Sequence, residues 1–219
     1  MSARATHSAQ AMLLAAVAVT GMGQTLVFAI LPSLGRAANL ADVQVGLIIT
    51  CSAFVFALAS PIWGRLSEYI GRKPVMIIGM TGYALGTLGF AVTFEAGIRG
   101  WLPSSLALLS LLILARCLQA AVMAASPPAA SAYMADITSI EGRTRGMGRI
   151  GAAHNLGTVF GPALGGLTAA LWLVLPLYLV VIITALMALW IAVRLPESPY
   201  MLIRPEPVEK FRLSAAARQ

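Results

Sequence analysis

Six long apolar stretches, separated by short polar gaps, constrain this chain more than any other feature of its sequence. A helix of about 20 mostly apolar residues is long enough to cross the roughly 30 Å hydrocarbon core of a bilayer. Each stretch is therefore a candidate transmembrane helix, and Trp172 and Pro176 favour a tight turn between the last two. The predicted spans are 10–34, 43–63, 74–94, 105–133, 146–170 and 174–193.

The composition agrees with a membrane protein and excludes several other classes. Of the 219 residues, 59% are hydrophobic and 11% are charged, whereas soluble domains average about 25% charged residues. A small water-soluble domain cannot bury that much apolar surface. We therefore predict an all-α integral membrane protein with six transmembrane helices. A soluble enzyme, a disordered chain and a disulfide-rich scaffold are excluded.

The formal net charge of +7 comes mainly from basic residues in the gaps between the apolar stretches. If both termini are cytoplasmic, 12 of the 15 Lys and Arg residues lie on the inner side, two lie outside, and Arg116 lies within a span. Positive residues concentrate on the cytoplasmic side of membrane proteins. The distribution predicts cytoplasmic termini in a plasma or bacterial inner membrane, with the lipid bilayer rather than nucleic acid as the partner.

The gap between the second and third predicted spans holds a compact motif that begins at Gly64 and ends at Pro74. Gly64 and Gly71 provide small positions or a positive φ angle, and Pro74 suits the first turn of the next helix. The basic pair Arg72 and Lys73 can anchor the inner face of the membrane domain. The spacing therefore predicts a tight cytoplasmic turn between two spans.

This loop resembles the signature of the major facilitator superfamily, G-x-L-a-D-r-x-G-r-k. Glu68 stands where that signature has Asp, and Tyr69 replaces a basic residue. In the family the acid contributes to a cytoplasmic contact between two six-span halves, and the resemblance assigns this role to Glu68. The matching positions are Gly64, Leu66, Gly71, Arg72 and Lys73.

The fifth predicted span contains glycines at a helical spacing. Gly157, Gly161 and Gly165 recur every four residues, so they lie on one face of a helix. Such a face lets a second helix approach closely, and Pro162 frees a backbone carbonyl and permits a bend. Gly148 falls on the opposite side of the helix.

Together with Gly166, these positions form a string similar to the span-five motif of the superfamily's antiporters, g-x8-G-x3-G-P-x2-G-G. Residues 132–143 and 195–198 are similar to the same branch of drug–proton antiporters. The resemblance implies proton-coupled antiport, with efflux of a small, drug-like molecule. It also implies the N-terminal half of a facilitator fold, built as a 3+3 inverted repeat.

Polar side chains within the spans gather at one depth. Arg116 lies deep in the fourth span, and Gln119 follows three residues later on the same face. Gln24 in the first span and His154 and Asn155 in the fifth reach about the same depth. These groups either form a substrate and proton pathway or satisfy one another for packing alone.

The resemblance also extends to the fourth span, where Arg116, Gln119 and Ala124 match an arginine motif that is linked to proton transfer in the family. Two of the glycines of that motif are replaced in this chain. Many relatives carry an acid in the first span, and this chain has Gln24 there. A half without that carboxylate is expected to bind substrate without carrying the proton, unless His154 titrates instead.

Facilitator transporters consist of two six-span halves with the substrate site between them. The resemblance implies that residues 1–194 form the first six-span half and that residues 195–219 are similar to the cytoplasmic loop that follows it. We expect a transporter rather than an enzyme, with no cofactor or metal, and with a small molecule, protons and a second six-span half as partners. The alternatives are a non-transporting interaction or regulatory subunit of the membrane and an inactive fragment. An intramembrane protease is disfavoured because His154 has no serine nucleophile in a suitable motif.

Overall fold

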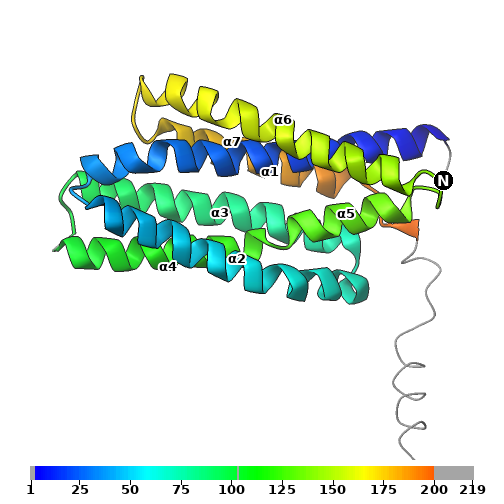
Figure 1. Ribbon diagram of the computed structural model, residues 1–219, viewed down its shortest axis with the longest axis horizontal. Helices are drawn as coiled ribbons and strands as arrows, with labels where there is room; N and C mark the ends of the chain where they lie inside the picture. The colour runs from blue at the N-terminus through cyan, green and yellow to red at the C-terminus, as the bar shows by residue number, and fades with distance from the viewer. Residues whose placement is uncertain (1–2, 103, 200–219) are drawn as a thin grey trace, which may run out of the picture.

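The computed structural model describes residues 3–102 and 104–199, which form a bundle of long helices (Figure 1). All regular elements within these residues are α-helices, and the predicted tail beyond residue 199 lies outside the described residues. The bounds are Ala3–Ala37 (α1), Asp42–Ile70 (α2), Arg72–Ile98 (α3), Ser105–Met123 (α4), Ser126–Asp136 (α5), Arg143–Ala169 (α6) and Leu175–Arg194 (α7).

Five segments of the described chain have the length and composition of membrane spans: α1, α2, α3, the α4–α5 pair and α7. With 27 residues, α6 is long enough to cross a bilayer, but its glycines and N-terminal arginines lower its mean hydropathy. It lies along α1 at the edge of the bundle (Figure 1). The fold is therefore an all-α membrane bundle of six crossing segments, in agreement with the predicted class.

The fourth crossing segment is divided into α4 and α5, whereas the sequence analysis treats residues 105–133 as one span. Pro127 and Pro128 lack the amide hydrogens that would continue the helix. At the break, the amide of residue 125 bonds to the carbonyl of Val122 at 3.1 Å instead of to that of Ala121. The indole N–H of Trp63 in α2 donates to the freed Ala121 oxygen at 2.7 Å. A side chain from a neighbouring helix thus satisfies the broken backbone.

The glycine face of α6 lies in backbone contact with α1. A methyl group added at Gly157 would overlap the carbonyl oxygen of Ala18, and one added at Gly161 would lie 2.8 Å from the amide nitrogen of Leu26. At Gly165 the added carbon would lie 3.2 Å from the side chain of Leu26. The contacts advance in the same direction along both helices, so α1 and α6 run parallel.

The proline of α6 lies beside this contact. Pro162 cannot bond to the carbonyl of Thr158, and the hydroxyl of Thr25 in α1 lies 3.1 Å from that carbonyl oxygen. Gly148 and Gly166 face away from α1, with no atom within 4 Å of an added methyl group. The α1–α6 contact therefore explains three of the motif's glycines and leaves these two on the outer surface of the described chain.

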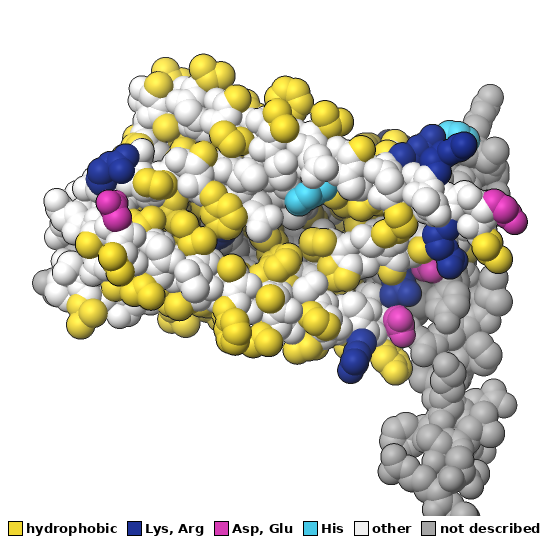
Figure 2. Space-filling model, in the orientation of Figure 1, with side chains coloured by type: hydrophobic (Ala, Val, Ile, Leu, Met, Phe, Trp, Pro, Cys, Tyr) yellow, Lys and Arg dark blue, Asp and Glu magenta, His cyan; other side chains and the backbone are white. Residues whose placement is uncertain are grey.

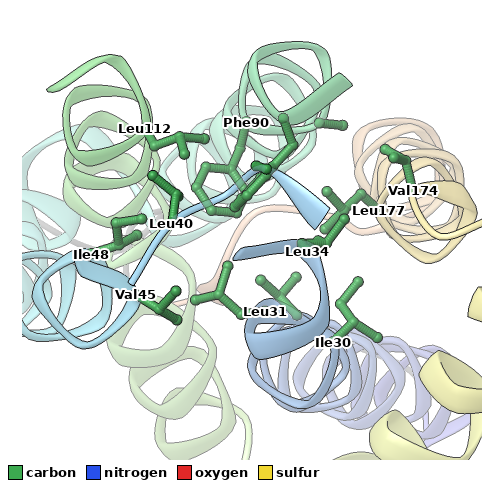
Figure 3. Close-up of a cluster of buried hydrophobic side chains, with 14 of the residues drawn as sticks. Ile30, Leu31, Leu34, Leu40, Val45, Ile48, Phe90, Leu112, Val174 and Leu177 are labelled. Atoms are coloured by element: carbon green, nitrogen blue, oxygen red, sulfur yellow. The ribbon is translucent and has the colours of Figure 1, made fainter. Parts of the chain in front are cut away.

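Buried apolar side chains from most of the helices hold the bundle together. One cluster joins α1, α2, α3, α4 and α7, and Figure 3 shows Leu31, Leu34, Phe90, Leu112 and Leu177 converging within it. All five side chains are fully buried. Large apolar residues also cover much of the visible outer surface (Figure 2), as expected for helices that face lipid.

Candidate transport site

A cavity of about 210 Å³ opens between α1, α2 and α4. Its walls are mostly apolar, and each of the three helices contributes one polar residue to the lining. An apolar pocket with a few convergent polar groups is the usual form of a small-molecule site. The lining includes Gln24 and Phe28 from α1, Ser52 and Phe56 from α2, and Arg116 and Met123 from α4.

Arg116 is the charged side chain of this cavity, and its residue is only 3% exposed. One terminal nitrogen of its guanidinium donates to the side-chain oxygen of Gln119, one turn further along α4. The guanidinium carbon lies 5.4 Å from the ring centre of Phe28 and 5.6 Å from that of Phe90. Both contacts are within the range of cation–π attraction, so aromatic rings from α1 and α3 hold the cation in place.

Gln119 extends the hydrogen-bond chain from Arg116 to α3. Its amide nitrogen donates to the hydroxyl of Thr87, and that hydroxyl donates to the carbonyl of Tyr83 at 2.7 Å. Gly86 permits this arrangement, because a methyl group added there would lie 2.5 Å from Cβ of Gln119. The side chain that orients Arg116 is thus itself fixed by a close approach of α3 and α4.

The structure brings some of the sequence-predicted site residues together and separates others. Gln24 and Arg116 line the cavity, with Gln119 directly behind Arg116. His154 and Asn155 are not part of the lining: the ring nitrogen Nδ1 of His154 would lie 2.9 Å from a methyl group added at Gly21, and Asn155 is exposed on α6. The structure therefore places His154 against α1 beside Gly21, outside the residues that line the cavity.

No carboxylate of the described chain lies at the depth of Arg116. The acidic residues within residues 3–102 and 104–199 occur at helix ends or in the connections between helices. They are Asp42, Glu68, Glu95, Asp136, Glu141 and Glu197. Within this part of the chain, the charge of Arg116 is accordingly stabilised by a hydrogen bond to Gln119 and by two aromatic rings rather than by an ion pair.

The motif from Gly64 to Pro74 forms a second polar site at the opposite end of α3 from the α3–α4 turn. Gly71 has a φ angle of 117° and joins α2 directly to α3, and this angle favours glycine. The carboxylate of Glu197 accepts hydrogen bonds from the amides of Arg72 at 3.0 Å and Lys73 at 3.1 Å. An acid at the N-terminus of a helix is favoured by the helix dipole, so Glu197 caps α3 from the segment that follows α7.

Arg72 ties three segments of this loop region together. Its guanidinium donates to Asp136 at the end of α5 at 3.3 Å and to the hydroxyl of Ser67 in α2 at 2.6 Å. The hydroxyl of Ser198 donates to the same carboxylate of Asp136 at 2.7 Å. Gly64 lies near α5, where an added methyl group would be 3.6 Å from Pro128, and Glu68 is exposed.

Several residues of these sites were not identified from the sequence. Thr87 is a polar residue within an apolar stretch, which is a usable signal, but its partner Gln119 could not be assigned without the packing of α3 on α4. Phe28 and Phe90 have the same sequence signature as lipid-facing aromatic residues. The capping role of Glu197 requires the α7 end to lie beside the start of α3, which no local pattern indicates.

Comparisons with known proteins agree with this architecture. A model described as the Major Facilitator Superfamily matches residues 13–218. Multidrug resistance protein 2 of Bacillus subtilis (strain 168) is 28% identical over 166 residues, which is 76% of this chain and 38% of that protein. Tetracycline resistance protein, class C, of Escherichia coli is 29% identical over 209 residues, which is 94% of this chain and 49% of that protein. The chain thus spans half or less of the length of these relatives.

Solved structures show the same fold. The human organic anion transporter MFSD10 (TETRAN) matches with a TM-score of 0.69 and 22% identity, over 88% of this chain and 48% of that chain. A bacterial homolog to the human lysosomal transporter Spinster matches with a TM-score of 0.70 and 18% identity, over 99% of this chain and 50% of that chain. The match covers about half of each of these transporter chains. The chain belongs to the major facilitator superfamily.

Proposed function

We propose that this chain is the N-terminal half of a proton-coupled exporter of small, drug-like molecules. The observation that carries the proposal is the apolar cavity that encloses the buried guanidinium of Arg116 between α1, α2 and α4. Buried charges in membrane spans mark substrate and ion pathways. The similarity to a multidrug resistance protein and to a tetracycline resistance protein supports efflux as the direction of transport.

A second six-helix half would complete the site by covering the face that carries the cavity. α2, which forms one wall, is the least buried of the five apolar spans. Its large apolar side chains Phe54, Leu58 and Ile62 are each more than half exposed. Substrate sites of transporters with this fold lie between the two halves, which rock around them. The exposed face of α2 is therefore the surface on which we place the second half.

The proton-carrying group is proposed to lie in that second half. Arg116 remains charged under all physiological conditions and cannot release a proton. The described spans of this chain contain no Asp or Glu at its depth, and His154 is not among the residues that line the cavity. Arg116 then acts as a fixed positive charge that favours the deprotonated state of a nearby carboxyl group.

The orientation of the bundle is proposed from its charge distribution. Lys and Arg side chains gather at the end of the bundle that carries the N-terminus (Figure 2), and positive residues favour the cytoplasmic side. In a background without Cys51 and Cys117, we expect Ser105→Cys to react with an impermeant maleimide from outside intact cells. Thr144→Cys should react only after the membrane is opened. Both positions are exposed, and the reverse labelling pattern would invert the proposed topology.

Efflux is tested in cells that lack their own exporters and produce this chain together with a second six-span half. We expect these cells to accumulate several-fold less of a fluorescent substrate than cells producing either half alone. The substrates should include anionic, neutral and cationic compounds. A protonophore should restore accumulation, because it removes the driving force. Equal accumulation in all strains would instead favour a non-transporting membrane subunit.

A further inference from the structure

The cavity has a charge that restricts what it can bind. Arg116 is buried in its wall, and no carboxylate of the described chain lies at the same depth. A cation that entered would meet a like charge in a medium of low dielectric constant, where repulsion is strong. The nearest aromatic rings, Phe28 and Phe90, already face the guanidinium. The quadrupoles of these rings are therefore engaged and offer little to a second cation.

Part of the guanidinium is unused. One terminal nitrogen donates to Gln119, but the Nε atom of Arg116 is buried without a hydrogen-bond partner among the described residues. An unsatisfied buried donor is costly, and a guanidinium edge matches the two oxygens of a carboxylate. The unused donor thus indicates a ligand group that carries negative charge and accepts hydrogen bonds.

The rest of the cavity indicates an apolar body. Ile49, Phe56 and Met123 form its walls, and Ser52 and Gln24 are its neutral polar groups. Its volume is about 210 Å³, and a dry cavity of about 150 Å³ accommodates benzene. A ligand with one or two fused rings therefore fits the space beside Arg116.

We propose that this cavity binds organic anions, with a carboxylate against the guanidinium of Arg116 and an aromatic body between Phe28 and Phe56. The inference rests on the proposed function, because it assigns a substrate class to the same cavity. It predicts that the exporter prefers amphiphilic acids to cationic drugs. The guanidinium of Arg116 gains an acceptor when the ligand binds, and the apolar walls exclude small inorganic anions because they cannot replace the water around those ions.

The test is isothermal titration calorimetry on the full chain in lipid nanodiscs, with probes that share one ring system. Naphthaleneacetate should bind at least about tenfold more tightly than naphthaleneacetamide, because a charge-assisted hydrogen bond replaces a neutral one. Naphthylethylammonium should bind most weakly of the three. Sodium acetate, which has the charge without the rings, should bind at least tenfold more weakly than naphthaleneacetate.

Three variants test whether the preference depends on Arg116. Arg116→Gln should remove the preference for the acid over the amide, and Arg36→Gln, which alters an exposed arginine at the far end of α1, should retain it. Gln24→Glu keeps Arg116 and adds a carboxylate to the cavity wall, so it should shift the preference towards the ammonium probe. This variant remains informative if Arg116→Gln does not fold.

The outcomes separate this inference from the proposed function. Tightest binding of the amide or the ammonium probe, no binding of any probe, or an acid preference that survives Arg116→Gln would overturn the organic-anion site. Proton-driven export by cells that carry both halves would then still support the transporter. Conversely, anion binding that depends on Arg116 without any export would leave the site intact and refute the exporter.

Discussion

Replacing Gly161 by leucine is expected to abolish efflux and to reduce the amount of folded protein in the membrane. A methyl group at this position would already lie 2.8 Å from the amide nitrogen of Leu26 and overlap the hydroxyl of Thr25. Backbone atoms of α1 cannot move aside as a flexible side chain can, so α1 and α6 must separate. Overpacking typically costs about 1–3 kcal/mol, and contact with backbone favours the upper part of that range.

The control for this substitution lies on the same helix. Gly166→Leu adds the same side chain at an exposed position where no atom lies within 4 Å of the added carbon. Efflux and the melting temperature of the purified bundle should both be close to those of the unmodified protein. If Gly161→Leu and Gly166→Leu behave alike in both measurements, the close α1–α6 contact is not required for folding or transport.

Replacing Arg116 by alanine is expected to abolish proton-driven efflux while the protein still inserts into the membrane. The change removes the only charge of the described cavity wall and leaves the side-chain oxygen of Gln119 without its donor. Arg116→Lys should restore a small part of the activity, because an ammonium keeps the charge but cannot reproduce the planar guanidinium. The measurement is the initial rate of efflux, normalised to the protein detected in membranes.

Arg36→Ala is the matched control for this loss. Arg36 is exposed in the last turn of α1 and bonds to Ser33 of the same helix. Its removal changes the net charge by the same amount without reaching the cavity, so efflux should be retained. Normal efflux in the Arg116→Ala variant would reduce Arg116 to a packing residue.

The fold could be predicted from the sequence because a bilayer leaves few alternatives. Backbone groups within lipid must be satisfied internally, so long apolar stretches become helices. The break between α4 and α5 was not predicted, although Pro127 and Pro128 are present in the sequence at this point. Prolines are tolerated within membrane helices when neighbours satisfy the freed carbonyls, and the indole of Trp63 does so here. That partner comes from another helix and cannot be located from the local sequence.

The candidate site could be predicted only in part. Arg116 and Gln119 were placed together because residues three apart on a helix share a face. His154 and Asn155 were grouped with them by depth, which follows from counting residues along each span. Depth does not give the direction in which a side chain points, and the described cavity is lined by α1, α2 and α4 without these two residues. Direction depends on packing, here on the glycine contact between α6 and α1.

The most direct test of the proposed exporter is proton movement in vesicles that contain a complete transporter with this chain as its N-terminal half. The vesicles enclose a pH-sensitive dye and hold an imposed proton gradient. We predict that adding a transported substrate speeds the decay of the gradient, that the acceleration saturates with substrate concentration, and that Arg116→Ala eliminates it. Substrate movement that leaves the proton gradient unchanged, with or without Arg116, would contradict proton-coupled export.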